Sequence, residues 1–234
     1  MTTTSRTRKV SANGKPPLAV AFLPGSDPDR NCPLCPRLVS FRGEARARHP
    51  EWFNSPVPSF GDPAARLAIV GLAPGLQGAN RTGRPFTGDY AGDLLYATLI
   101  EYGFATGTYQ ARPDDGMKLV DCRIVNAVSC VPPQNKPLPV EIANCRPFLL
   151  SAIESMPRLS AIVALGRIAH ESTVKTFGLR ASTVPFAHGA VHQAGRYRLY
   201  DSYHCSRYNT NTGVLTPEMF HSVFDKVRAD LALP

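Results

Sequence analysis

Three loops of this chain concentrate residue types that can act on a polar ligand. The first, residues 71–89, holds five glycines and two prolines. Because glycine has no side chain, a ligand can approach the backbone of this loop closely. Within it, Arg81 and Arg84 can contact phosphates, and Phe86 can stack on a base. Asp89 can direct a water molecule, or it can simply cap a following helix.

The second and third loops carry hydrogen-bonding side chains. Asn126 ends a predicted strand, and its amide offers a donor and an acceptor side by side, which suits the edge of a pyrimidine. In the third loop, residues 203–213, His204 can polarise a bound carbonyl. Arg207 and Tyr208 of the same loop can enter a nucleic-acid groove. Taken singly, such an Asn or His is more often structural, so the interpretation depends on the three loops lying together.

Six cysteines raise the question of a metal centre. One pair is a C-x-x-C motif, Cys32 and Cys35, and a second pair, Cys130 and Cys145, is separated by 14 residues. Four thiolates in two pairs can hold either zinc or a [4Fe–4S] cluster. A zinc ribbon normally uses two C-x-x-C motifs, so the asymmetric spacing favours iron–sulfur. Cys122 and Cys205 are expected to be buried packing residues.

A pair of histidines is a further metal candidate. His188 and His192 are four residues apart, which would place both on one face of a helix. Gly189 and Gly195 argue against a helix there. We therefore expect this pair not to bind a metal.

The elements that must position these loops alternate along the chain. Apolar runs predict strands at 67–70, 124–128, 161–165 and 196–202, and helices are predicted at 92–102, 140–156, 167–177 and 216–233. Interleaved strands and helices predict an α/β fold with a mostly parallel sheet covered on both faces. In such sheets the chemistry lies beyond the carboxyl ends of the strands. The three loops follow the first, second and fourth predicted strands.

Composition sets the broad class. The 234 residues are 43% hydrophobic and 19% charged, close to globular averages, which excludes wholesale disorder. The longest apolar run, Leu18 to Leu23, is too short to span a bilayer, and no signal peptide follows Met1. We expect a basic tail at 1–16, one domain at 17–234, and a cytoplasmic protein. The net charge of +8 favours a polyanionic partner.

The three loops together resemble the uracil-DNA glycosylase superfamily, and most closely its family 5 branch. The motifs that carry the resemblance are Gly71-Leu72-Ala73-Pro74-Gly75, residues 80–89, and His204-x-Ser206-x-x-Asn209 followed by Thr212-Gly213. The resemblance implies a three-layer α/β/α sandwich with a central four-stranded, mostly parallel sheet. It also implies a [4Fe–4S] cluster on Cys32, Cys35, Cys130 and Cys145.

The same resemblance implies roles for individual residues in removing a flipped base from DNA. Phe86 would stack on the base and Asn126 would read its edge, in a site lined by Gly71, Ala73 and Gly75. His204 would stabilise negative charge on the departing base. Asp89 would position water, because the stretch 73–75 offers no polar side chain. The implied DNA contacts are Arg81, Arg84, Ser206, Arg207, Tyr208 and Asn209.

The expected activity is that of a monofunctional DNA repair glycosylase in the bacterial cytoplasm. It would act as a monomer on double- and single-stranded DNA, removing uracil and also hypoxanthine and ethenocytosine. Two alternatives remain: a non-catalytic nucleic-acid-binding protein with a structural zinc, and an enzyme acting on free nucleotides. Brown colour separates the cluster from zinc, and salt-sensitive duplex binding separates DNA from free nucleotides.

Overall fold

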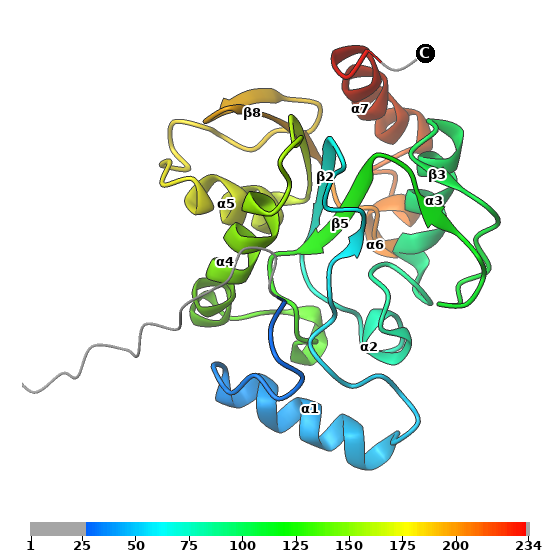
Figure 1. Ribbon diagram of the computed structural model, residues 1–234, viewed down its shortest axis with the longest axis vertical. Coiled ribbons are helices and arrows are strands. Elements are labelled where there is room, and N and C mark those ends of the chain that lie inside the picture. Colours follow the sequence, from blue (N-terminus) through cyan, green and yellow to red (C-terminus); the bar gives the residue numbers. More distant parts are fainter. Residues whose placement is uncertain (1–26, 233–234) are drawn as a thin grey trace, which may run out of the picture.

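A six-stranded sheet forms the centre of the protein. The structure is a computed structural model and describes residues 27–232, so the predicted tail at 1–16 lies outside the described residues. The strand order is β1-β5-β2-β6-β8-β7 (Figure 1). Four neighbouring strands run parallel, namely β5 (Cys122–Asn126), β2 (Leu67–Gly71), β6 (Ala161–Leu165) and β8 (Tyr197–Ser202). Antiparallel strands close the two edges, β1 (Phe60–Gly61) on β5 and β7 (Val191–Ala194) on β8.

The prediction of four strands holds for the parallel part of the sheet and is wrong for the total. The parallel strands could be predicted from the sequence because they are buried on both faces and are therefore continuously apolar, as in β2 and β6. The edge strands carry no such signal. β1 has two residues, and β7 is polar and mostly accessible to solvent.

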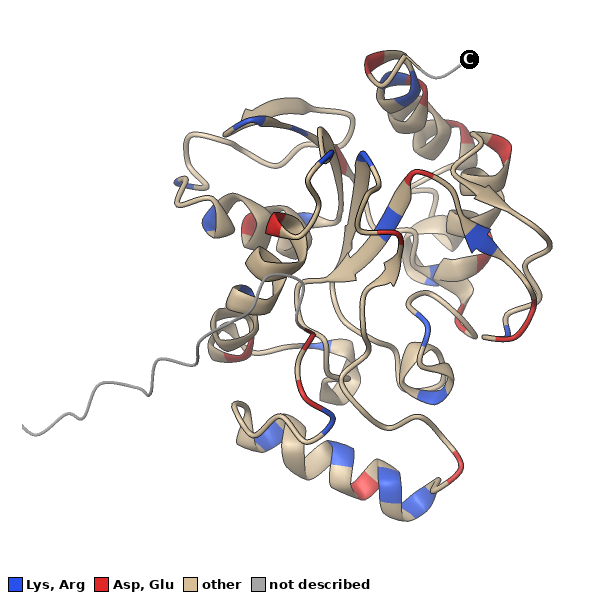
Figure 2. Cartoon of the chain, in the orientation of Figure 1, with Lys and Arg blue, Asp and Glu red and all other residues tan. Residues whose placement is uncertain are grey.

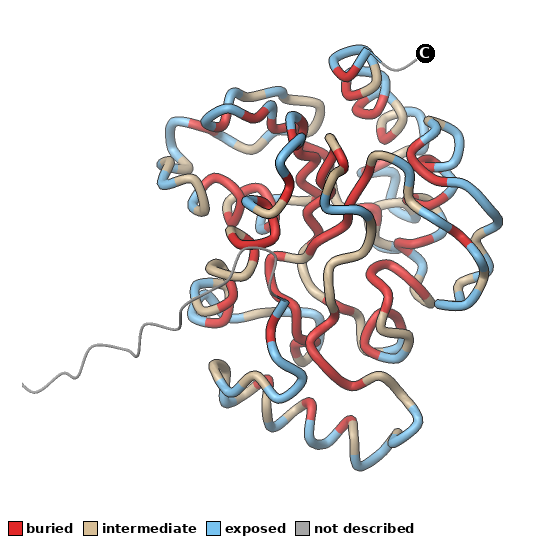
Figure 3. Tube along the Cα trace, in the orientation of Figure 1, coloured by how far each residue is buried: buried red, intermediate tan, exposed pale blue. Residues whose placement is uncertain are grey.

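Helices cover both faces of the sheet and make it the middle of three layers. One core packs side chains of α3 (Tyr90–Glu101) and α7 (Pro217–Asp230) against Ile69, Ile124 and Val163. The other packs α4 (Pro139–Glu154) and α5 (Arg167–Thr176) against Val70 and Ile162. Figure 3 shows the sheet strands as the most continuously buried part of the chain. The predicted α/β/α sandwich is confirmed.

The last helix shows how the sequence sets an element locally. The Thr216 hydroxyl accepts a hydrogen bond from the Met219 amide at 3.2 Å, and Pro217 occupies the first turn, where an amide proton is not needed. The residues that α7 buries recur at helical spacing, namely Phe220, Val223, Phe224 and Val227. One apolar face is therefore turned to the sheet, as an amphipathic helix requires.

Smaller elements complete the fold. α1 (Pro36–Arg48) lies at one end of the molecule, below the sheet in Figure 1. The short elements are α2 (Ala79–Thr82), the strand pair β3 (Ala105–Thr106) and β4 (Lys118–Leu119), the 3₁₀ turn η1 (Pro133–Asn135) and α6 (Arg207–Asn211). Within residues 27–232, no helix has both the length and the apolar character needed to cross a bilayer.

Candidate active site

The three predicted loops meet at one end of the parallel strands. Gly71 at the end of β2 is in register with Asn126 at the end of β5, and β8 ends at Ser202, just before His204. Together the loops enclose a cavity with an empty volume of about 270 Å³. Its lining is Ala73, Pro74, Gly75, Ala79, Phe86, Asp89, Ala91, Asn126 and His204. The structure thus brings together both predicted catalytic residues and the predicted base-binding side chains.

Gly71 allows the side chains of Phe86 and Asn126, both predicted to bind a base, to approach each other. A Cβ atom at residue 71 would lie 2.5 Å from Asn126 Oδ1 and 2.8 Å from the Phe86 ring. Phe86 has a φ of 52°, and the Tyr109 hydroxyl donates a hydrogen bond to its carbonyl at 3.0 Å. Asn126 is half-buried at the end of β5, and it lines the cavity. Its amide can therefore contact a ligand there.

His204 faces Phe86 across the cavity, with ring centroids 6.0 Å apart. Burial lowers the pKa of His204 to about 4, so its imidazole is neutral at physiological pH. Its backbone carbonyl accepts a hydrogen bond from Asn209 Nδ2 at 2.8 Å, which holds the loop. The cavity therefore contains a neutral hydrogen-bond donor on a fixed backbone.

Asp89 occupies the N-cap position of α3, where its carboxylate faces the backbone amides of Ala91 and Gly92. Oδ1 is buried and has no hydrogen-bond partner within residues 27–232. Oδ2 faces the backbone of Gly75 and Gly78, where a Cβ atom would collide with it. Burial raises the pKa of this carboxyl group. Buried polar atoms normally have partners, so an unpartnered carboxylate oxygen in a cavity indicates a site for a bound water or substrate.

A wider hollow opens outward from this cavity and shares Ala73, Gly75, Asp89, Ala91 and His204 with it. Its rim includes Ser206, Arg207 and Tyr208. Tyr208 is 74% exposed, and the Arg207 guanidinium lies 5.2 Å from the ring centroid of Tyr90. Two exposed side chains of α6 thus lie beside the entrance to the cavity.

Ser206 and Asn209 hold the loop itself. The Ser206 hydroxyl caps α6 by accepting from the Asn209 amide at 3.4 Å, and Asn209 binds the His204 carbonyl. Ser206 also lines the hollow. Their predicted DNA contacts remain predictions.

The two arginines of the first loop lie in different environments. Arg81 is exposed on α2 and stays available for a phosphate. Arg84 is only 5% exposed and forms a two-bond ion pair with Asp115, with both N–O distances 2.7 Å. The Arg84 hydrogen bond holds the pKa of Asp115 well below its usual range. Because the charge of Arg84 is already paired inside the protein, the structure gives no support to its predicted DNA contact.

Four residues that line the hollow were not among the predicted site residues, namely Leu72, Tyr90, Ala91 and Asn135. The polar ones are Tyr90, at the start of α3, and Asn135, on η1. Asn135 follows Gln134, and both have a positive φ of 57°. The Pro132-Pro133 pair marks a rigid corner there. Nothing in the sequence shows that this corner reaches the hollow.

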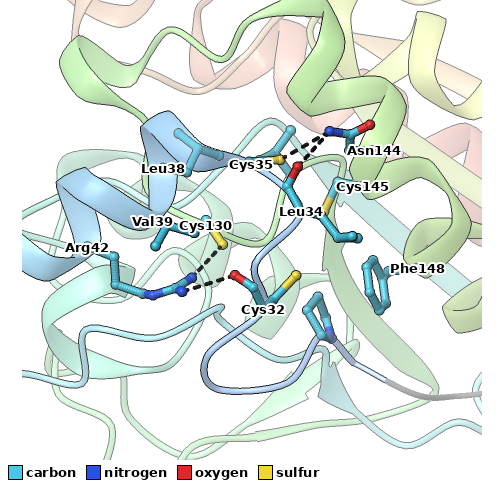
Figure 4. Close-up of a pocket in the computed structure, with 12 residues that line it drawn as sticks. Cys32, Leu34, Cys35, Leu38, Val39, Arg42, Cys130, Asn144, Cys145 and Phe148 are labelled. Atoms are coloured by element: carbon cyan, nitrogen blue, oxygen red, sulfur yellow. Dashed lines mark hydrogen bonds between the residues drawn. The ribbon is translucent and has the colours of Figure 1, made fainter. Parts of the chain in front are cut away.

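The four predicted metal-binding cysteines line a second cavity, called here the thiol cavity. Figure 4 shows the sulfur atoms of Cys32, Cys35, Cys130 and Cys145 around one space, which has an empty volume of about 320 Å³. Cys32 and Cys35 precede α1, and Cys145 lies on α4. None of the four forms a disulfide bond within the described chain.

Nitrogen donors surround these sulfur atoms. Arg42 Nη1 lies 3.6 Å from Cys130 Sγ, and the Ser129 amide lies 3.3 Å from Cys145 Sγ. Asn144 Nδ2 lies 3.7 Å from Cys35 Sγ. Such donors stabilise negative charge on sulfur. Burial raises the pKa of Cys130 to about 12 and that of Cys145 to about 11, so a bound cation must displace their protons. The donor set therefore fits a thiolate-ligated metal centre.

The distances between the four sulfur atoms indicate which kind of metal centre they could hold. Four ligands at about 2.3 Å from one zinc ion lie about 3.8 Å from one another. The sulfur atoms of the four cysteines do not all lie within 4.8 Å of one another. One group of two histidines and an aspartate elsewhere in the described chain has its ligand atoms within that distance. The wider spacing fits a cluster of several metal ions better than a single zinc. Cys122 and Cys205 are fully buried, as expected for packing residues.

Fold and site together define an α/β/α protein with a small, polar-edged cavity at the carboxyl ends of its parallel strands and a separate four-thiol cavity. The family model described as "Uracil DNA glycosylase superfamily" matches residues 58–228. The chain belongs to this superfamily.

Similar proteins cover most of the chain. A protein of Thermus thermophilus named Type-5 uracil-DNA glycosylase is 47% identical over 199 residues, which are 82% of this chain and 90% of that protein. A relative of the same name from Pyrobaculum aerophilum is 42% identical over 204 residues, covering 86% and 89% of the two chains. A third, from Mycobacterium tuberculosis, is 41% identical over 207 residues, covering 84% and 77%.

Proposed function

We propose that this protein is a monofunctional uracil-DNA glycosylase of the type-5 kind, which hydrolyses the N-glycosidic bond of a damaged nucleotide and leaves an abasic site. The observation that carries the proposal is the shared cavity of Phe86, Asn126, His204 and Asp89. This set supplies a face for stacking, an edge-reading amide, a neutral donor and an unpartnered carboxylate. The relatives named Type-5 uracil-DNA glycosylase support the same activity.

The base enters the cavity by leaving the DNA stack. An enzyme cannot reach the glycosidic bond of a paired base, so the nucleotide is flipped out at a cost of a few kcal/mol. The exposed Arg207 and Tyr208 at the rim are placed to fill the gap that the base leaves. Arg81 adds a phosphate contact from α2.

His204 acts on the departing base. When the bond between C1′ and the base nitrogen breaks, its electron pair stays with the base and positive charge develops on the sugar. A neutral imidazole donates a hydrogen bond to the base oxygen, and this bond strengthens as charge builds. The low pKa of His204 keeps the ring neutral, so it stabilises the charge without first giving up a proton.

Asp89 acts on water. Its Oδ1 accepts a hydrogen bond from a water molecule, whose oxygen then bonds to C1′ while its proton passes to the carboxylate. That proton later balances the charge on the released base. The carboxylate must be ionised for this step, although burial favours its neutral form.

The finer parts of the function follow from the same site. We propose that the enzyme acts as a monomer in the cytoplasm, on double- and single-stranded DNA, and that it also accepts hypoxanthine and ethenocytosine. Apart from Asn126 and His204, the side chains lining the cavity place few donors or acceptors against the base, which favours broad acceptance.

The thiol cavity is proposed to hold a [4Fe–4S] cluster through Cys32, Cys35, Cys130 and Cys145. When bound, the cluster would supply cross-links between the segment before α1, the start of the 130–136 loop and α4. Arg37 of α1 reinforces the same connection through an ion pair with Glu141 of α4 at 2.7 Å.

A strand-nicking assay tests the function. Duplex and single-stranded oligonucleotides carry one uracil, hypoxanthine or ethenocytosine, and alkali is added after the enzyme. We expect nicks that require alkali, because the product is an abasic site. Asp89→Asn should slow their formation by about 10²–10⁴-fold, and the neighbouring exposed Asp93→Asn should not. No nicking of uracil DNA by the brown, folded protein would overturn the proposal, as would uracil release from free nucleotides alone.

A further inference from the structure

A second set of metal-binding side chains lies outside both cavities. His170 of α5, His192 of β7 and Asp201 of β8 form the histidine–aspartate group. One ligand atom from each residue lies within 4.8 Å of the other two. None of the three lines the catalytic cavity or the thiol cavity. The sheet brings them together from positions up to 31 residues apart.

The group is buried, with one accessible member. His170 and Asp201 are each 0% exposed, and the His192 side chain is 18% exposed. His170 Nδ1 lies 2.7 Å from Asp201 Oδ1, and His192 Nε2 lies 3.1 Å from Oδ2. The only ion-pair partners of Asp201 among the described residues are these two histidines. The Ala187 amide donates a further hydrogen bond to Oδ2 at 3.3 Å, so the positive charge that balances this buried carboxylate must come from a protonated histidine or a bound cation.

The other nitrogen of His170 fixes the direction of its ring. Nε2 lies 2.7 Å from the Val184 carbonyl oxygen, which can only accept, so Nε2 carries a hydrogen. In the neutral ring Nδ1 then presents a lone pair to a carboxylate oxygen. Two lone pairs at 2.7 Å repel each other, so a cation must lie between them: a proton on Nδ1, or a metal ion after a small outward shift of the side chains.

We propose that this group is a divalent metal site of the zinc class, with His170 Nδ1, His192 Nε2 and the Asp201 carboxylate as protein ligands. Imidazole and carboxylate are typical zinc ligands, and a ligating histidine almost always donates its second N–H to a carbonyl or carboxylate. His170 and Val184 already have that arrangement. The partial exposure of the His192 side chain provides an entry route from solvent.

The site would be structural, not catalytic. It connects α5, β7 and β8, and Asp201 lies three residues before His204. The Asp201 amide and carbonyl also bind Ala190 and Gly189, which join the preceding loop to β8. Metal binding would therefore stiffen the end of the strand that carries the catalytic histidine.

Zinc binding to the full-length, cluster-loaded protein tests the proposal. Wild type, His192→Gln and His221→Gln are equilibrated with buffered Zn²⁺, and bound zinc and Tm are measured. His221 is a matched control, because it also lies beside a carboxylate, with its Nδ1 3.7 Å from Glu101. We expect wild type and His221→Gln to bind one more zinc than His192→Gln. At 100 times the Kd their Tm should rise by about 5–10 °C, and that of His192→Gln should not.

Two results would overturn the site. If wild type binds no extra zinc, a proton bridges His170 and Asp201 instead. If His192→Gln binds as much zinc as wild type, the ion lies elsewhere, for example on the thiols. His192 is partly exposed, so its variant should fold. His170→Gln is a second variant, expected to lose the same zinc if it is stable.

Discussion

Replacing Asp89 by Asn separates the two roles that a carboxylate can have at the start of a helix. The substitution keeps the shape of the side chain and removes its charge. If Asp89 positions and activates water, the rate should fall by about 10²–10⁴-fold, the usual contribution of a general base. The loss should be equal for uracil and hypoxanthine, because water attacks the sugar and not the base.

The structure also predicts what should not change. A lost N-cap costs about 0.5–2 kcal/mol, which is a fall in Tm of roughly 1–8 °C for a domain of this size. Asn caps a helix about as well as Asp does, so the substitution keeps any interaction with the Ala91 and Gly92 amides. The Tm of Asp89→Asn should therefore equal or exceed that of wild type, since a buried charge is removed.

The assay is single-turnover nicking of uracil duplex, with Tm measured on the same samples. Asp93→Asn is the matched control, because it is the same substitution one turn along α3 on an exposed residue. Wild type should lose activity as the pH falls through the raised pKa of Asp89, since the carboxylate becomes protonated. The activity that remains in Asp89→Asn should not show this fall at acid pH. A lower Tm with a proportionate loss of activity, or a loss confined to uracil, would refute the water-positioning role.

His204→Ala should slow base release by roughly two to three orders of magnitude with little change in substrate binding, as for loss of one preorganised donor, and single-turnover rates against Kd would show it. Equal losses in both would refute the role. Arg207→Ala should reduce turnover more on well-paired duplex than on single-stranded uracil DNA, and equal losses would contradict a wedge. Arg84→Met should lower the free energy of unfolding by about 3–5 kcal/mol, because it leaves Asp115 buried and unpaired, yet the salt dependence of DNA binding should stay unchanged. Cys145→Ser should remove visible colour and lower Tm before it affects chemistry, whereas full colour would remove Cys145 from the ligand set.

The parallel part of the fold was predictable because burial on both faces leaves a direct mark on the sequence. β6 begins and ends at the predicted residues, and β2 is one residue longer than predicted. The second strand, predicted at 124–128, forms two residues earlier as β5, and Asn126 remains at its end. The edge strands β1 and β7 were missed, because a short or half-exposed strand has no continuous apolar run.

The sequence by itself determined which loops carry chemistry. Parallel strands bring their carboxyl ends to one edge, so Gly71, Asn126 and His204 had to meet once the strands were recognised. The four cysteines were likewise identified by type and spacing, and they line one cavity.

Only the tertiary structure decided how each polar side chain is used, since that depends on neighbours distant in sequence. Arg84 is paired with Asp115, 31 residues away, whereas Asp89 Oδ1 is buried without a hydrogen-bond partner among the described residues. His192 looked unsuited to metal beside His188, but the sheet places it against Asp201 and His170. Local sequence sets backbone conformation and burial, whereas the pairing of buried charges is settled when separate elements pack.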